Sequence, residues 1–301
     1  MKIASIDIGT NTILLLIAEF IDSKLEIIED YHKIARLGEG LDKSGYISES
    51  AISRALKILE FYSERIEFHN IKTIEIVATS AMRDANNSFE VKRSLESIIK
   101  SNIYIIEGKE EAKYSFIGSI EDDKLNTVID IGGGSTEIIT GKSNEIYNIT
   151  SLQTGAVRLS ERNNLFYPFS VEAQTNADDE LNKIYDEVKG FQFGEIIAVA
   201  GTPNTLGQIN LGLKEYSREK LHNYRMSSSA LDNVIEVIKN NPKEFLVEEY
   251  GVHSNRADII LGGALVLQKL LQISKKQSFT ISANGLRFGV AKAYYMKKVI
   301  G

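Results

Sequence analysis

The chain has 301 residues, of which 43% are hydrophobic and 25% are charged, and its formal net charge is −6. This composition is that of an ordinary globular protein and leaves room for two domains of about 150 residues each. The absence of cysteine excludes disulfides, thiolate metal sites and cysteine nucleophiles, and it fits a cytoplasmic location. The negative charge argues against a general nucleic-acid or acidic-membrane binder, so an anionic ligand has to be held locally.

Neither a membrane span nor a histidine metal site is expected. The longest apolar run near the N-terminus covers only residues 13–18 and is ended by Glu19, so it predicts neither a signal peptide nor a transmembrane helix. The four histidines are scattered, and none has another histidine four residues away. Backbone N–H groups, a metal ion and a few arginines are therefore the expected anion ligands.

Strands alternate with helices along the first part of the chain, which predicts the α/β class. Apolar runs and period-two patterns predict strands at residues 2–8, 12–20, 24–31, 73–79 and 103–106. Helical periodicity predicts helices at residues 48–68, 88–101 and 109–120.

The pattern then begins again about 120 residues further on. Residues 127–131 and 136–141 form a second predicted hairpin, like residues 2–8 and 12–20. Further helices are predicted at 171–190, 229–240, 257–272 and 287–299, with strands near 195–199 and 279–282. The repeat predicts a duplicated domain. We place the first domain at residues 1–120 plus a C-terminal helix of about 288–301, and the second at residues 121–287.

Each predicted hairpin has a glycine turn that is suited to phosphate. Asp7 stands two residues before Gly9, and Asp130 stands two residues before Gly132. Glycines let the backbone approach an anion closely, and each aspartate at a strand end is placed to hold Mg²⁺ directly or through water. The alternative is that both are ordinary tight turns, but the recurrence of the whole arrangement favours phosphate binding. Thr10 and Asn11 add donors to the first turn, and Ser135 and Thr136 add donors to the second, which also contains Gly133 and Gly134.

A third loop, with Gly201 and Thr202, lies between a predicted strand and a stretch that resembles a helix. A helix N-terminus after a strand can cradle a phosphate, although the Walker lysine is missing and an ordinary turn is equally consistent.

Together these loops resemble the superfamily of acetate and sugar kinases, heat-shock chaperones of the seventy-kilodalton class, and actin. Within it, the chain is most similar to the exopolyphosphatase / guanosine pentaphosphatase family. The segments that carry this resemblance occur in the family's order at residues 7–12, 78–85, 108–112, 128–137, 153–158, 200–202, 256–258 and 284–287. The resemblance implies two duplicated actin-like, ribonuclease H-like domains with an active-site cleft between them.

The resemblance also implies roles for single residues. The water-activating base of the family corresponds to Glu111. The like charges of Glu110 and Glu111 would raise the proton affinity of one of the two carboxylates, which suits a general base. The alternative is that both glutamates merely favour the first turn of a helix. Asp7, Asp130 and Glu137 become the carboxylates that hold Mg²⁺ or Mn²⁺, with Asp130 and Glu137 also ordering the catalytic water.

Four arginines are candidate anion ligands. Arg83 can pair with a phosphate oxygen through bidentate contacts, or it can form a surface ion pair with a neighbouring acid. Arg158, Arg256 and Arg287 are candidates for a longer polyanion track, and structural ion pairs are an equally good explanation of them.

Larger members of the family carry a further helical domain, so the resemblance implies the short, two-domain form. We expect domain closure about residues 118–124 and 285–290. The third loop contains Pro203 where the family usually has hydroxyl residues, which raises the question of a lost N–H donor there.

The leading hypothesis is hydrolysis of a terminal phosphoanhydride in inorganic polyphosphate, in guanosine pentaphosphate, or in both. A small-molecule kinase of the same fold, and a non-catalytic actin-like nucleotide-binding protein, are the alternatives. No aromatic cluster for reading a base is evident, which favours polyphosphate. A homodimer is expected only because dimers are the commonest oligomers.

Overall fold

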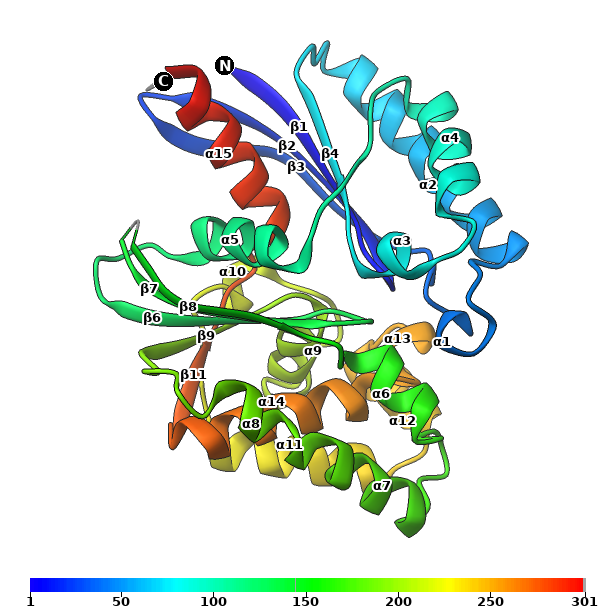
Figure 1. Ribbon diagram of the computed structural model, residues 1–301, viewed down its shortest axis with the longest axis vertical. Coiled ribbons are helices and arrows are strands. Elements are labelled where there is room, and N and C mark those ends of the chain that lie inside the picture. Colours follow the sequence, from blue (N-terminus) through cyan, green and yellow to red (C-terminus); the bar gives the residue numbers. More distant parts are fainter. Residues whose placement is uncertain (144, 300–301) are drawn as a thin grey trace. The chain divides into compact units, whose positions relative to one another are not determined.

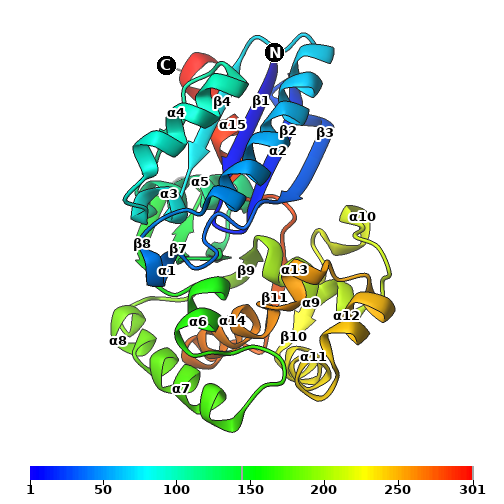
Figure 2. The ribbon, with the colours of Figure 1, turned by 90° about the vertical axis from the view of Figure 1, so that its right-hand side faces the viewer.

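The computed structural model of the protein describes residues 1–143 and 145–299. The chain forms two compact units, and each is an α/β domain built on one mixed sheet (Figures 1 and 2). Unit 1 comprises Met1–Gly118 and the segment that begins at Leu286, and unit 2 comprises Ser119–Gly285. The last two residues of the helix predicted at about 288–301 lie outside the described residues. Within the described ranges, no helix is both long and apolar enough to cross a membrane.

The sheet of unit 1 has the strand order β3-β2-β1-β4-β5. Its first three strands are an antiparallel meander of β1 (Lys2–Ile8), β2 (Thr12–Ile21) and β3 (Lys24–Ile34). The next two, β4 (Ile74–Ala78) and β5 (Tyr104–Ile105), run parallel to β1. The nearly continuous apolar runs of β1 and β2 place isoleucine and leucine side chains on both faces of the sheet, because successive side chains of a strand point to opposite faces.

Helices cover both faces of this sheet (Figure 1). On one face lie α2 (Glu49–Phe68), whose N-terminus is capped by Ser48, and α4 (Ser88–Ile99). On the other lies α15 (Leu286–Val299), whose Phe288 and Ala291 pack against β1 and β2. The shorter helices of the unit are α1 (Leu41–Ser44), α3 (Ser80–Asp84) and α5 (Gly108–Ser119).

The sheet of unit 2 repeats this order, reading β8-β7-β6-β9-β11 with β10 added at the edge. Its strands are β6 (Leu125–Ile131), β7 (Thr136–Lys142), β8 (Glu145–Leu152), β9 (Glu195–Val199), β10 (Arg225–Ser227) and β11 (Ser278–Ile281). As in unit 1, three antiparallel strands are followed by parallel ones. The predicted duplication and α/β class are therefore confirmed.

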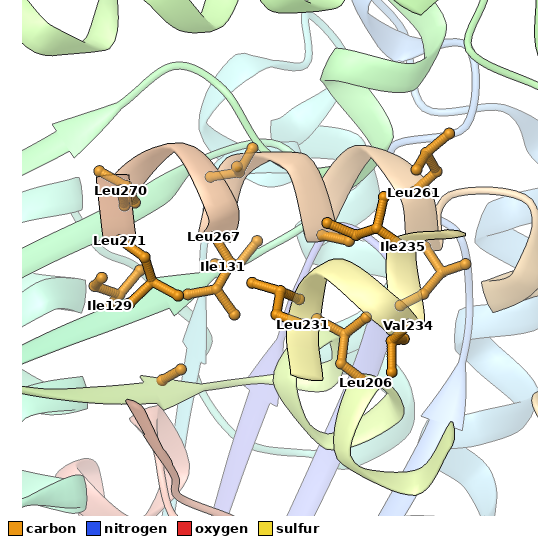
Figure 3. Close-up of a cluster of buried hydrophobic side chains, with 14 of the residues drawn as sticks. Ile129, Ile131, Leu206, Leu231, Val234, Ile235, Leu261, Leu267, Leu270 and Leu271 are labelled. Carbon is orange, nitrogen blue, oxygen red and sulfur yellow. The ribbon is translucent and has the colours of Figure 1, made fainter. Parts of the chain in front are cut away.

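The main core of unit 2 lies between its sheet and a layer of helices (Figure 3). The labelled side chains come from β6, α9 (Gly201–Asn210), α11 (Ser228–Asn240) and α14 (Ile260–Ser274). They belong to one apolar cluster, which also includes Ala198 of β9 and so joins β9 to α9. The remaining helices are α6 (Ala156–Arg162), α7 (Val171–Asn182), α8 (Ile184–Val188), α10 (Arg218–Leu221), α12 (Lys243–Tyr250) and α13 (Ser254–Ala257).

Two predicted helices are wrong in extent. The helix predicted at 171–190 is the pair α7 and α8, because the N–H of Lys183 bonds to the carbonyl of Glu180, three residues back, and tightens the turn. The helix predicted at 257–272 is α13 followed by α14, with a similar tightening at Ile259. Strand β8 and the helices α6 and α12 were not predicted. They are short and only partly apolar, so tertiary packing decides their structure.

Candidate active site

Three predicted site elements of unit 1 lie at one edge of its sheet. The glycine turn follows β1, α3 with Arg83 follows β4, and α5 with Glu111 follows β5. The parallel pairing of β1, β4 and β5 brings their carboxyl ends together. This edge is where open α/β sheets bind their ligands.

The glycine turn of unit 1 is fixed by the segment that follows β3. The N–H of Gly9 donates to the Thr12 carbonyl at 3.0 Å, closing the turn. The Thr10 carbonyl accepts from Gly38 at 2.9 Å, and the Asn11 carbonyl accepts from Ala35 at 3.0 Å and from Arg36 at 2.9 Å. These bonds fix the orientation of the peptide planes in the turn. An anion-binding turn requires such fixed orientations, because its N–H groups have to point at the same anion.

Arg83 and Glu111 form a buried ion pair at the same edge of the sheet as this turn. The Arg83 Nη1 atom donates to Glu111 Oε2 at 2.7 Å and to the Ile106 carbonyl at 2.8 Å. Their side chains are only 12% and 9% exposed. A guanidinium that is held by a backbone carbonyl fixes the carboxylate rotamer, so Glu111 is preorganised.

The charged group that contacts Glu111 is the Arg83 guanidinium and not the Glu110 carboxylate. Glu110 is exposed and accepts a hydrogen bond from the Tyr114 hydroxyl at 3.2 Å. The two glutamates occupy the first turn of α5, as the alternative explanation required, but only Glu111 is buried. In a structural role, Arg83 was expected to pair with an acid close to it in the sequence. Its partner Glu111 is instead 28 residues further along the chain.

The glycine turn of unit 2 is fixed in the same way. The N–H of Gly132 donates to the Ser135 carbonyl at 3.0 Å. The carbonyls of Gly132 and Gly133 accept from the first residues of α6: Ala156, Val157 and Arg158, at 2.8 to 3.0 Å. A Cβ atom on Gly155 would lie 2.6 Å from the Gly133 backbone, so only glycine permits this approach.

Two carboxylates face each other beside this turn. Asp130 on β6 pairs directly with Glu137 on β7, so their side chains project from the same face of the sheet. They are 8% and 1% exposed. Ser151 on β8 donates to Glu137 Oε1 at 2.7 Å. Like charges directly opposite each other in a sheet are unfavourable, so this arrangement is suited to a nearby cation.

The donor set fits Mg²⁺. Mg²⁺ is usually held by one or two carboxylates, waters and substrate phosphates, and Asp130 with Glu137 supplies such a pair. In unit 1, Asp7 stands opposite Leu14 and so has no acidic residue facing it across β2. Among residues 1–143 and 145–299, no cluster of three or more His, Cys, Asp or Glu side chains could hold a metal ion. The fit is therefore to a metal shared with phosphate, and not to a closed protein cage.

The third loop is a strained turn that holds an arginine. Ala200, between β9 and α9, has φ of 76° and ψ of −165°, a conformation that side chains rarely adopt. A Cβ atom on Gly201 would lie 1.6 Å from Arg256 Nη1, so Gly201 makes room for the guanidinium. Burial lowers the pKa of Arg256 to about 10. Gly201 thus has a packing reason beside its predicted role in phosphate binding.

Pro203 costs the third loop no helical hydrogen bond. It lies in the first turn of α9, where N–H groups have no partner within the helix. The Asn204 amide donates to the Ala200 carbonyl at 2.8 Å, and the Thr205 hydroxyl donates to the Gly201 carbonyl at 2.9 Å. Thr202 packs closely on Gly263 of α14. Side chains of α9 therefore stabilise the strained turn from within.

A family profile described as the Ppx/GppA phosphatase family matches residues 16–296. The chain belongs to the Ppx/GppA phosphatase family. As a member of this family it is a hydrolase.

Several relatives are similar over nearly the whole chain. A bifunctional 3-dehydroquinate synthase/phosphatase of Fusobacterium nucleatum is 36% identical over 93% of this chain, which spans 45% of that relative. Exopolyphosphatase 2 of Mycobacterium tuberculosis is 29% identical, with 96% of this chain and 97% of the relative covered. A guanosine-5'-triphosphate,3'-diphosphate pyrophosphatase of Pseudoalteromonas atlantica is 27% identical over 95% of this chain and 57% of the relative. This chain therefore spans about half the length of two of these three relatives.

A solved structure agrees with the fold. The crystal structure of the Ppx/GppA family member of Aquifex aeolicus has a TM-score of 0.83 and 28% identity to this chain, with 99% of each chain covered.

The other candidate arginines have partners in this Ppx/GppA protein. Arg287 on α15 donates to both carboxylate oxygens of Asp30 on β3, at 2.9 and 2.8 Å, so the structural ion pair is confirmed for this residue. Arg158 donates to Gln153 Oε1 at 2.8 Å and is 7% exposed. The backbone N–H of Arg158 donates to the Gly133 carbonyl, so Arg158 contacts the unit 2 turn directly.

The segment that fixes the unit 1 turn was not among the predicted site residues. Gly38 is required there, since a Cβ atom would lie 2.1 Å from Thr10 Cγ2. Arg36 stands in the same segment with a positive φ of 54°. The available signal was the Arg-Leu-Gly-Glu-Gly run at residues 36–40, which interrupts the chain between a predicted strand and a predicted helix.

Proposed function

We propose that this protein removes terminal phosphate from a phosphoanhydride chain, with inorganic polyphosphate as the preferred substrate and guanosine pentaphosphate as the second candidate. The observation that carries the proposal is the buried Glu111, held by Arg83 at the sheet edge where the phosphate-type turn ends β1. A carboxylate in this setting is suited to accept a proton from an attacking water.

Glu111 is the general base in this mechanism. Arg83 holds Oε2, which restricts rotation of the carboxylate and fixes the direction from which water can be activated. The attacking oxygen gives its proton to Glu111 and bonds to the terminal phosphorus, while the bridging oxygen leaves with the shortened chain. In-line displacement needs little covalent chemistry from the protein, so positioning and charge stabilisation dominate.

The glycine turns are the phosphate ligands. Gly9, Thr10 and Asn11 in unit 1, and the turn from Gly132 to Ser135 in unit 2, offer backbone N–H groups whose peptide planes are fixed by neighbouring segments. Asp130 and Glu137 would hold Mg²⁺ or Mn²⁺, with Asp7 as the metal ligand of unit 1. The metal would neutralise charge on the phosphate oxygens.

Two observations favour polyphosphate. The chain is matched over nearly the full length of a relative named exopolyphosphatase, whereas it spans 57% of the guanosine pentaphosphate relative. The turns also recognise phosphates alone, and each polyphosphate unit presents only phosphate. Guanosine pentaphosphate additionally requires a pocket for purine and ribose.

The test is phosphate release by the purified full chain with Mg²⁺, given long-chain polyphosphate and guanosine pentaphosphate separately. Glu111→Gln should lower kcat by about 10²–10⁴-fold, the typical contribution of a general base. Glu110→Gln is the matched control, since Glu110 occupies the same helical turn but is exposed. Its kcat should stay within about twofold of wild type.

No phosphate release from either substrate by folded wild-type protein would overturn the proposed function. Release that survives in Glu111→Gln would keep the function and remove Glu111 as its base. A higher kcat/KM for guanosine pentaphosphate than for polyphosphate would reverse the order of the two substrates.

A further inference from the structure

One cluster of charged side chains adjoins the unit 1 turn and has no role in the mechanism above. Glu39 binds two arginines at once: its Oε1 lies 3.0 Å from Arg36 Nη2, and its Oε2 accepts from Arg54 Nη2 at 3.0 Å. Arg54, on α2, also donates through Nε to the Ala35 carbonyl at 2.7 Å. A carboxylate is therefore held between two guanidinium groups on the segment that fixes the turn.

The position of Arg36 is set by the turn itself. Its N–H donates to the Asn11 carbonyl at 2.9 Å, so the arginine is joined directly to the proposed phosphate ligand. Its φ of 54° lies in the left-handed region, which is unfavourable for a residue with a side chain. Backbone strain of this kind concentrates at functional sites, where the surrounding structure maintains it.

Unit 2 provides an independent observation through the duplication. There the N–H of Arg158 donates to the Gly133 carbonyl at 3.0 Å, on the segment that fixes the second turn. Both turns thus carry an arginine whose own N–H bonds to a turn carbonyl. The two segments have different structures, an irregular loop in unit 1 and helix α6 in unit 2. The recurrence of arginine on both points to a shared need for positive charge there.

We propose that Arg36 and Arg54 form a binding subsite for the phosphates that follow the terminal one in a polyphosphate chain. Glu39 occupies this subsite when no substrate is bound. Its two oxygens satisfy both guanidinium groups much as two oxygens of a phosphate would. Substrate phosphate replaces the Glu39 carboxylate, which is 40% exposed and can turn to solvent. The inference rests on the proposed function and adds a determinant of chain length to it.

Charge explains why such an arrangement is useful. The protein has a net charge of −6, so attraction of a polyanion depends on local cations. Two arginines without a compensating acid would repel each other and would bind any passing anion. With Glu39 in place, only a ligand that offers several phosphates in a row displaces the carboxylate, so long chains are favoured over single anions.

The experiment compares KM and kcat on tripolyphosphate and on long-chain polyphosphate for full-length variants. Arg36→Gln should raise KM for the long chain by about tenfold, the worth of a charge-assisted contact, and the rise should be smaller for tripolyphosphate. Glutamine meets the same backbone strain as arginine at this position, so the change tests the guanidinium. Glu39→Gln should act in the opposite direction and lower KM for the long chain by about threefold, because the competing charge is gone.

Arg93→Gln is the control, because Arg93 is an exposed arginine of the same unit that lies over the ring of Phe89 on α4. It should leave both KM values within about twofold of wild type. Opposite shifts in Arg36→Gln and Glu39→Gln, growing with chain length, support the subsite. Shifts in the same direction, or equal shifts on both substrates, overturn it, since a structural cluster would give either result. Direct binding of long-chain polyphosphate to the Glu111→Gln protein separates the two proposals: binding without hydrolysis by wild type refutes only the function, and no binding refutes both.

Discussion

The two units share a strand order and a way of fixing a glycine turn, yet they differ in what surrounds that turn. In unit 1 the turn carries Thr10 and Asn11, and the sheet edge beside it holds the Arg83–Glu111 ion pair. In unit 2 the turn has three glycines followed by Ser135, and the Asp130–Glu137 pair stands beside it. The two units therefore share the backbone arrangement of the glycine turn but differ in the side chains that surround it. The proposed base, Glu111, belongs to unit 1, and the Asp130–Glu137 carboxylate pair belongs to unit 2.

The units also differ in how their sheets are covered. The large core of unit 2 is built from helices within one continuous stretch of chain. One face of the unit 1 sheet is covered by α15, which comes from the far end of the sequence. Arg287 joins this helix to Asp30 on β3, and it is 3% exposed. In unit 1 the buried Arg287–Asp30 ion pair thus adds to the apolar contacts that hold α15 on the sheet.

Breaking that ion pair should have the largest effect on stability. Asp30→Asn leaves the buried Arg287 uncompensated and should lower the free energy of unfolding by about 3–5 kcal/mol at pH 7. Glu26→Gln, an exposed change on the same strand, should be nearly neutral. Urea unfolding of both variants measures this. If Asp30→Asn unfolds at the same urea concentration as wild type, the view that unit 1 relies on this pair is wrong.

The pH dependence of the same variant sharpens the test. Burial alone would raise the pKa of Asp30, but the Arg287 guanidinium and the nearby His32 outweigh burial and hold the pKa well below its usual value. The folded pKa is therefore depressed, so the stabilisation is fully present above the unfolded pKa of about 3.9 and is lost as pH falls below it. The stability gap between wild type and Asp30→Asn should be constant from about pH 7 to 5 and should narrow below about pH 4. A gap that widens on acidification would contradict this assignment.

The two glycine turns also differ in how rigidly their neighbouring segments fix them. A Cβ atom on Gly155 would meet backbone atoms of Gly133, which cannot move without distorting the turn, whereas one on Gly38 would meet only the Thr10 side chain. Gly155→Ala should therefore cost more than Gly38→Ala, within the range of about 1–3 kcal/mol that is typical of overpacking. Gly190→Ala, which would have no neighbour within 4 Å, is the control. Denaturation midpoints that rank Gly38→Ala as the more damaging change would show that the unit 1 turn is the more rigid one.

The fold was largely predictable because its signals are local. The strands β1, β2, β6 and β9 are apolar runs with polar turns, and the repeat of an aspartate before a glycine turn revealed the duplication. Strand β8, which reads Glu-Ile-Tyr-Asn-Ile-Thr-Ser-Leu, was missed since it is polar and partly exposed. It forms because β7 offers it a partner edge, and a propensity argument cannot see that edge.

The sequence yields the candidate site residues one by one but not the contacts between them. Glu111 and Arg83 were both candidates, yet their contact joins residues 28 positions apart and depends on the register of β4 and β5. The expected influence of Glu110 on the proton affinity of Glu111 stays a prediction; the structure shows only that Glu110 is exposed and accepts a hydrogen bond from Tyr114. Gly38 is explained by its close approach to the Thr10 side chain, and Gly155 by its close approach to the Gly133 backbone; no sequence pattern displays either contact.

The last and smallest effect separates the aspartates of the two turns. Asp130 faces Glu137 across the sheet, whereas Asp7 faces Leu14. Glu137→Gln removes a like-charge contact, so the metal-free protein should become more stable by about 0.2–1 kcal/mol, while Asp7→Asn should bring no such gain. Calorimetry in a chelator, repeated with Mg²⁺ and tripolyphosphate, measures both. If the carboxylate pair holds the metal, adding the two ligands should raise the Tm of wild type and leave Glu137→Gln nearly unchanged, because stabilisation by a ligand follows its affinity for the native state. A Tm increase of equal size in the two proteins would place the metal elsewhere, and the division of roles between the units would then rest on Glu111 alone.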